Sequence, residues 1–190
     1  MTGPLAPVTD SLEVRWFFRG PLAPEAGAWF ASLGPDVADE TRTDRYLVPA
    51  ESDDLGLKIR EGTVQAKQRV GAFGTRPLAP GARGGVEAWR KWTLGSAGTV
   101  PGEGWIDVAK SRRQRPVVLL GRHARCALEL SELDARGEAW WSVCLEASGA
   151  SPRARWMALR ESARLWLRTA PSLNEEHAMG YPAWLRRFAG

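Results

Sequence analysis

Basic side chains alternate with apolar ones along two neighbouring segments of the chain. Lys58 and Arg60 are separated by Ile59, and the next segment carries Lys67 and Arg69 in the same alternation. Because successive side chains of a β-strand point to opposite faces, each segment predicts a strand with one basic face and one apolar face. Lys and Arg suit contacts with the oxygens of phosphate or carboxylate groups. The two segments therefore predict a surface for an anionic partner.

Two further segments divide into faces in the same way. Within residues 104–120, one face begins with Ile106 and Val108 and ends with Lys110 and Arg112. A strand is also predicted over residues 12–18. Its two faces are Glu13, Arg15 and Phe17 on one side and Val14, Trp16 and Phe18 on the other.

Two glutamates lie among small residues in a predicted hairpin at residues 125–149. Glu129 alternates with alanine and serine, and Glu146 alternates with serine and cysteine, so there is room around each carboxylate. If both glutamates face the same side, Cys126 and Cys144 face opposite sides and cannot form a disulfide. Two free thiols are therefore expected.

Tight turns and helices must position these strands. Hairpin turns are predicted at residues 61–62 and 134–137. A helix over residues 24–33 is expected to cover one end of a barrel. Residues 71–85 are rich in Gly and Pro without a period, which predicts a flexible loop. Helices are predicted over residues 151–190, where Ser151 and Pro152 begin the first helix and a short helix ends the chain.

The apolar strand faces need a partner, and two arrangements provide one. Helices packed outside an antiparallel barrel would cover them and leave the charged faces in a hydrated interior. An open sheet with one wet face and ordinary surface charges fits the same alternation. The ten Trp residues indicate a packed wall or a stacking surface. We expect one α+β domain over residues 1–190, built on the barrel.

The order of these segments resembles the CYTH superfamily, the triphosphate tunnel metalloenzymes. The matching segments are Glu13-Val-Arg15, TDRYL, LGLKIREG with QAKQR, AKSRR, ELSEL with CLEASG, and GYPAWL. They extend from Leu12 to Leu185, nearly the whole chain. The resemblance implies an eight-stranded antiparallel β-barrel with helices packed outside and a triphosphate site in its interior.

The resemblance also implies roles for individual residues. The expected phosphate contacts are Arg15, Lys58, Arg60, Lys67, Arg69, Lys110 and Arg112. The expected ligands of Mg²⁺ or Mn²⁺ are Glu13, Glu129 and Glu146, of which the last two would be catalytic. The first-strand signature of the family alternates two Glu and a Lys, whereas this chain has Arg15 and Phe17 at its second and third positions.

Three functions remain open at this point. The first is a metal-dependent phosphohydrolase acting on a triphosphate-containing substrate. The second is a catalytically degenerate module that binds polyphosphate or nucleotide anions without turnover. The third is a structural or interaction domain whose charges neutralise one another internally.

Composition limits the setting in which the protein acts. The chain has 190 residues, a net charge of +4 and two cysteines, too few for the disulfide framework of a small secreted domain. No apolar run approaches the ~20 residues of a membrane span, and the first residues do not follow the pattern of a signal peptide. We expect a cytoplasmic monomer or homodimer with a polyphosphate or triphosphate-bearing small molecule as its partner, and neither a membrane nor a specific nucleic acid.

Overall fold

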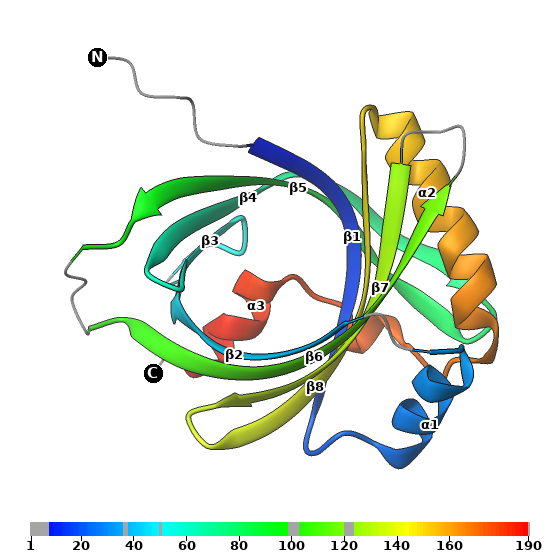
Figure 1. Ribbon diagram of the computed structural model, residues 1–190, viewed down its shortest axis with the longest axis horizontal. Coiled ribbons are helices and arrows are strands. Elements are labelled where there is room, and N and C mark those ends of the chain that lie inside the picture. Colours follow the sequence, from blue (N-terminus) through cyan, green and yellow to red (C-terminus); the bar gives the residue numbers. More distant parts are fainter. Residues whose placement is uncertain (1–7, 36–37, 50, 99–102, 120–123, 190) are drawn as a thin grey trace.

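The computed structural model describes residues 8–35, 38–49, 51–98, 103–119 and 124–189. Eight antiparallel strands in this part of the chain form a closed barrel in the order β1-β5-β4-β3-β2-β6-β7-β8 (Figure 1). The strands are β1 (Val8–Arg19), β2 (Ala38–Leu47), β3 (Leu55–Arg60), β4 (Thr63–Ala79), β5 (Ala82–Ser96), β6 (Trp105–Leu119), β7 (Ala124–Ala135) and β8 (Glu138–Gly149). Closure excludes the open sheet and confirms the predicted α+β barrel.

Helices accompany the barrel at three places in the described residues: α1 (Pro24–Ser32), α2 (Pro152–Trp166) and α3 (Tyr181–Leu185). Short 3₁₀ turns follow at Leu167–Thr169, Glu175–His177 and Arg186–Phe188. The predicted start of α2 is confirmed, because Ser151 Oγ accepts a hydrogen bond from the Ala154 amide at 3.2 Å. None of the helices described is both long and apolar enough to cross a membrane.

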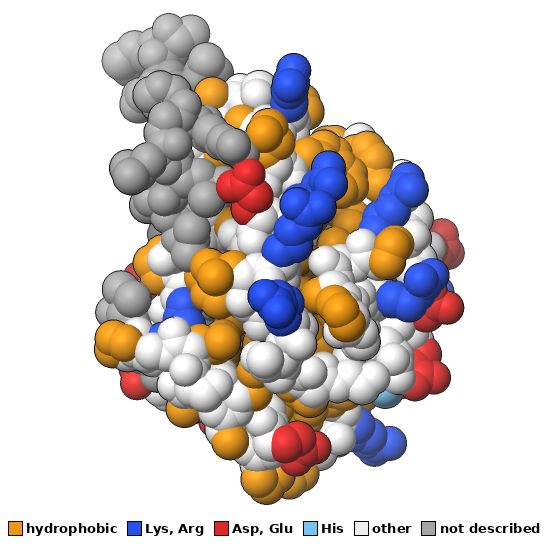
Figure 2. Space-filling view, turned by 90° about the vertical axis from the view of Figure 1, so that its right-hand side faces the viewer, with side chains coloured by type: hydrophobic (Ala, Val, Ile, Leu, Met, Phe, Trp, Pro, Cys, Tyr) orange, Lys and Arg blue, Asp and Glu red, His pale blue; other side chains and the backbone are white. Residues whose placement is uncertain are grey.

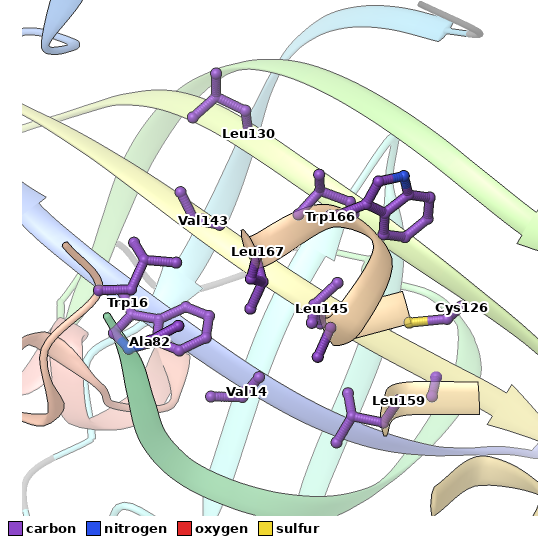
Figure 3. Packing of buried hydrophobic residues seen from close by; sticks show 14 of the residues in the cluster. Val14, Trp16, Ala82, Cys126, Leu130, Val143, Leu145, Leu159, Trp166 and Leu167 are labelled. Carbon is purple, nitrogen blue, oxygen red and sulfur yellow. The ribbon is translucent and has the colours of Figure 1, made fainter. Parts of the chain in front are cut away.

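The apolar face of β1 forms the outer side of the wall. Val14 and Trp16 are buried together with Leu145 of β8 and Leu159 of α2 (Figure 3). Helix α2 therefore covers the outside of β1, β7 and β8, as expected for a helix packed on a barrel. The opposite face of β1 is left to the interior.

Helix α1 also packs on the outer wall. Trp29 and Phe30 belong to the same buried cluster as Leu159, and Trp29 Nε1 donates a hydrogen bond to the carbonyl of Trp166 at 3.2 Å. The prediction that this helix covers a barrel end is wrong. Its aromatic side chains find their apolar partners beside α2 instead.

One end of the barrel is closed by the C-terminal segment. Trp184 stacks on Phe17 with ring centroids 4.8 Å apart, and Tyr181 stacks on Tyr46 at 5.1 Å. The apolar start of the inward face of β6, including Ile106, is buried in the same cluster. Figure 1 shows α3 within the ring of strands. The interior is thus apolar at this end and becomes charged further along β6.

Residues 71–85 are part of two strands, which corrects the prediction of a flexible loop. They form the distal part of the β4–β5 hairpin, where bulges interrupt the register and so hide the period of two. Gly84 permits close packing there, because a Cβ at this position would lie 2.7 Å from Cγ2 of Val14. Trp16 Nε1 also donates a hydrogen bond to the carbonyl of Arg83 at 2.8 Å.

Both predicted hairpin turns are confirmed. Glu61 and Gly62 have φ values of 49° and 71°, and Arg136 and Gly137 have values of 54° and 78°. Two successive residues with positive φ match the right-handed twist of the strands on either side. These turns fix the register of β3 with β4 and of β7 with β8.

Candidate anion-binding site

A cavity of about 420 Å³ occupies the interior of the barrel. All eight strands and α3 contribute to its lining. Among the described residues, nine basic side chains line it but only four acidic ones. The basic ones are Arg15, Arg42, Lys58, Arg60, Lys67, Lys91, Lys110, Arg112 and Arg125. Positive charge is therefore in excess inside the barrel.

Nine of the ten residues expected at the site line this cavity. They are Glu13, Arg15, Lys58, Arg60, Lys67, Lys110, Arg112, Glu129 and Glu146. Arg69 is the exception. Its guanidinium forms ion pairs with Glu87, at 2.5 Å, and with Asp54, which hold it away from the cavity lining.

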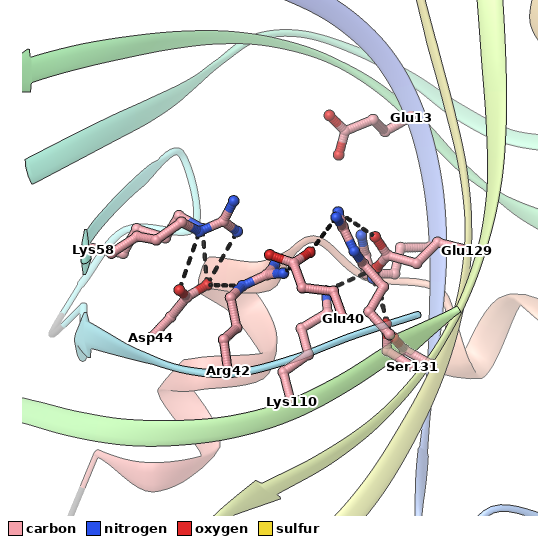
Figure 4. A network of polar contacts seen from close by, with 12 residues as sticks. Glu13, Glu40, Arg42, Asp44, Lys58, Lys110, Glu129 and Ser131 are labelled. Carbon is pink, nitrogen blue, oxygen red and sulfur yellow. Dashed lines mark hydrogen bonds and ion pairs between the residues drawn. The ribbon is translucent and has the colours of Figure 1, made fainter. Parts of the chain in front are cut away.

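Glu129 is the centre of a first charge cluster (Figure 4). Its Oε1 accepts hydrogen bonds from Arg15 at 2.8 Å, Lys110 at 2.9 Å and Ser131 at 3.1 Å, and Arg112 lies 3.6 Å from Oε2. Burial acts to raise the pKa of this carboxyl, but Lys110 and Arg15 outweigh it and hold the pKa well below its usual range. Glu129 is therefore ionised and surrounded by cations.

Asp44 of β2 is the centre of a second cluster. Three cations contact its carboxylate: Lys58 at 2.9 Å, Arg60 at 3.1 Å and Arg42 at 3.2 Å. Burial acts to raise the pKa of Asp44, but Lys58 and Arg60 outweigh it and lower the pKa. Burial and the positive charge of Arg60 in turn lower the pKa of Lys58 to about 7.

Glu40 joins the two clusters. Its carboxylate pairs with Arg42 of the Asp44 cluster and with Arg112 of the Glu129 cluster. Figure 4 shows the resulting chain of polar contacts, which runs from β3 across β2 and β6 to β7. Several cations are thus held at fixed positions along one wall of the cavity.

A third group of charges lies around Glu13. Its Oε1 accepts a hydrogen bond from Lys67 Nζ at 2.5 Å. Glu13 is also directly opposite Glu146 on β8 and Glu87 on β5 in the register of the sheet. The negative charge of Glu13, together with burial, raises the pKa of Glu146. These side chains form the acidic part of a mainly basic interior.

The carboxylates do not fit a divalent metal ion as they stand. Lys110 and Arg15 contact Oε1 of Glu129, Arg112 lies 3.6 Å from its Oε2, and Lys67 pairs with Glu13. Within the residues that the structure describes, no group of three or more His, Cys, Asp or Glu side chains could hold a metal ion. The sequence expectation of a site made by Glu13, Glu129 and Glu146 therefore stays a prediction without geometric support.

The contribution of β2 to the cavity was not predicted from the sequence. Glu40, Arg42 and Asp44 all point into the barrel, and Asp44 alone organises three cations. The signal was present, because these residues and Tyr46 occupy every second position of the segment. Tyr181, which lines the cavity from α3, had no such signal in the sequence, because its place depends on how the chain end folds back.

No protein-family model matches this chain, and none of the curated proteins matches it.

Proposed function

We propose that the protein binds a polyphosphate or a triphosphate-bearing small molecule inside the barrel, as a catalytically degenerate member of the CYTH superfamily. The observation that carries this proposal is the excess of basic over acidic side chains in a cavity closed at one end by α3. A triphosphate requires several fixed cations at once. Lys58, Arg60 and Lys110 are held at fixed positions by carboxylates, so little ordering is needed when such a ligand enters.

The proposed binding mode is an exchange of partners. Each buried carboxylate neutralises part of the positive charge around it. A bound phosphate oxygen then accepts hydrogen bonds from the N–H donors that the carboxylates leave unused. Arg112 illustrates this, because its side chain is 22% exposed while it pairs with Glu40 and Glu129. The guanidinium has five N–H donors, so it can contact a phosphate without releasing both carboxylates.

Thermal unfolding with tripolyphosphate tests the proposal. At a ligand concentration of 100 Kd, binding to the folded state adds about 2.7 kcal/mol, which for a chain of this size corresponds to a rise in Tm of roughly 5–11 °C. Lys67→Ala and Arg60→Ala should each reduce the rise, measured from the Tm of the same variant without ligand. Arg153→Ala, on the exposed side of α2, should not.

The rise should shrink as salt is added, because salt screens the attraction between the anion and the cavity. It should be the same with and without a chelator, since binding by the lysines and arginines needs no metal. Absence of a shift at millimolar tripolyphosphate and low ionic strength would refute the anion-binding function.

Metal-dependent hydrolysis is the second candidate, and one observation favours it. Glu13 and Glu146 lie directly opposite each other on neighbouring strands, an arrangement of like charges that a bound cation would stabilise. In this case, phosphate release from tripolyphosphate should require Mg²⁺ or Mn²⁺ and should be lost in Glu146→Gln. Robust metal-dependent turnover by the unaltered protein would refute the proposal of a module that binds anions without turnover. Metal-free binding without turnover would refute the hydrolase.

A further inference from the structure

The lysines of this chain are distributed very differently from its arginines. The sequence contains four lysines, and all four line the central cavity: Lys58, Lys67, Lys91 and Lys110. None of the four is exposed at the surface. Figure 2 shows basic side chains over one outer face, and those exposed on α2 are Arg153, Arg160 and Arg164. The protein therefore carries arginine on its surface and keeps lysine for the cavity.

This distribution indicates that the cavity uses a property that arginine lacks. Arg and Lys both carry a positive charge, but the guanidinium does not lose its proton in proteins. The ammonium of lysine can lose its proton when it is buried near other cations, and the neutral amine is a nucleophile. The four lysines are therefore the positions at which amine chemistry could occur.

Lys58 has the geometry for such chemistry. Its Nζ lies 2.9 Å from Oδ2 of Asp44, and the same carboxylate is shared with Arg60 at 3.1 Å and Arg42 at 3.2 Å. Glu40 also pairs with Arg42, but it is shared with Arg112, so that two carboxylates face four cations and positive charge is in excess. Of the four, only the lysine can relieve this excess by releasing a proton.

Groups on the neighbouring elements also act on the charge of Lys58: further cations disfavour the ammonium form, whereas the face of an aromatic ring favours it. Lys110 of β6 adds a further positive charge that disfavours the ammonium form, and the ring of Tyr46 lies 5.6 Å from Nζ. Burial and these cations lower the pKa of Lys58 to about 7, although Asp44 opposes the shift. Tyr181 of α3 stacks on Tyr46 and is neutral, since burial raises its pKa.

The remaining lysines differ from Lys58 in their contacts. Lys67 has a close pairing with Glu13, at 2.5 Å, which favours its charged form. Lys110 is only 6% exposed and lies against Glu129. Lys58 is 17% exposed and lines the cavity, so a small molecule inside the barrel can reach its amine.

We propose that Lys58 is a nucleophilic amine that forms an imine with a phosphate-bearing aldehyde, whose phosphate is held by the surrounding arginines. The neutral amine attacks the carbonyl carbon and a C–N bond forms. The two hydrogens of the amine leave with the carbonyl oxygen as water, so no oxidant or reductant is needed. The phosphate contact rests on the proposed function, whereas the reactivity of the amine does not.

Pyridoxal 5′-phosphate is a suitable probe, with borohydride reduction to trap the imine and peptide mass spectrometry to locate it. At pH 7 we expect Lys58 to be labelled at least about tenfold faster than Lys91, the matched half-buried lysine of the same cavity. The rate should fall as the pH is lowered below 7. K58R should remove this label while keeping the positive charge, and K91R should leave the label at Lys58. The Tm of each variant shows whether it is folded.

Pyridoxal without its phosphate separates this inference from the proposed function. Faster labelling by the phosphorylated probe, with protection by tripolyphosphate, supports both. Equal labelling of Lys58 by the two probes would refute the phosphate contact but support the amine. If Lys58 reacts no faster than Lys91 in folded protein, the inference is overturned, even where tripolyphosphate still raises Tm.

Discussion

Replacement of Asp44 by Asn is expected to destabilise the barrel strongly. The side chain of Asp44 is 1% exposed, and its carboxylate neutralises Lys58, Arg60 and Arg42. Asn keeps the shape of the side chain but removes the charge, which leaves three neighbouring cations without their shared partner. Breaking a buried ion pair from one side costs about 3–5 kcal/mol, because the remaining charge stays buried. For a chain of this length, the corresponding fall in Tm is roughly 6–20 °C.

Asp107→Asn is the matched control for this experiment. Asp107 also pairs with an arginine of β2, Arg45 at 2.9 Å, but both side chains are about half exposed. Exposed ion pairs contribute about 0–1 kcal/mol, so this variant should lose at most a few degrees. Calorimetry of the two variants beside the original protein provides the comparison. An equal loss of stability in both variants would refute the assignment of Asp44 as the neutralising centre of its cluster.

The effect of Asp44→Asn should also depend on pH. The neighbouring cations lower the pKa of Asp44 in the folded state, so its carboxylate adds stability above the unfolded value of about 3.9. That stability is lost as the pH falls through the folded pKa. The difference between variant and original should therefore be constant at neutral pH and diminish in acid. Tripolyphosphate should stabilise the variant more than the original, because the ligand replaces the missing negative charge.

Three further predictions concern the wall and the outer helix. Gly84→Ala should cost about 1–3 kcal/mol in urea unfolding, because the new Cβ would lie 2.7 Å from a methyl group of the buried core, whereas Gly85→Ala meets nothing within 4 Å and should be tolerated. Cys126 and Cys144 should not react with a thiol reagent until the protein unfolds, since both are buried and burial raises the pKa of each thiol. Ser151→Ala should cost about 1 kcal/mol by removing the cap of α2, measured by the same urea unfolding.

The strand faces could be predicted because alternation is a local property of the chain. The two faces of β1 and the apolar-to-basic face of β6 follow directly from the sequence, and the interior holds the predicted Arg15 and Lys110. The distal hairpin could not be predicted in the same way. Its bulges shift the register, and Gly84 is explained only by the close approach of Val14 and Trp16 from a distant strand.

The candidate site could be predicted less completely than the strands. The basic residues were found because each lies in a clear alternation, but the pairing of Glu129 with Arg15 and Lys110 depends on three strands that meet only in the closed barrel. The resemblance assigned Glu129 to a metal ion, and the structure surrounds it with cations instead. Alternation shows which side chains share a face, and only the fold shows which opposite charges come into contact.

In the proposed binding mode, the internal ion pairs limit the affinity of the cavity for an anion. An entering anion finds Lys110 and Arg15 already in contact with Glu129, so part of the attraction between ligand and cation is offset by the interaction that the ligand weakens. The net free energy of binding comes from the hydrogen-bond donors that the carboxylates leave unused and from the excess of cations over carboxylates. Removing an internal carboxylate should therefore weaken the fold and strengthen anion binding together. This coupling distinguishes a binding cavity from an interior in which the charges only neutralise one another, because in the second case no external anion would recover the lost stability.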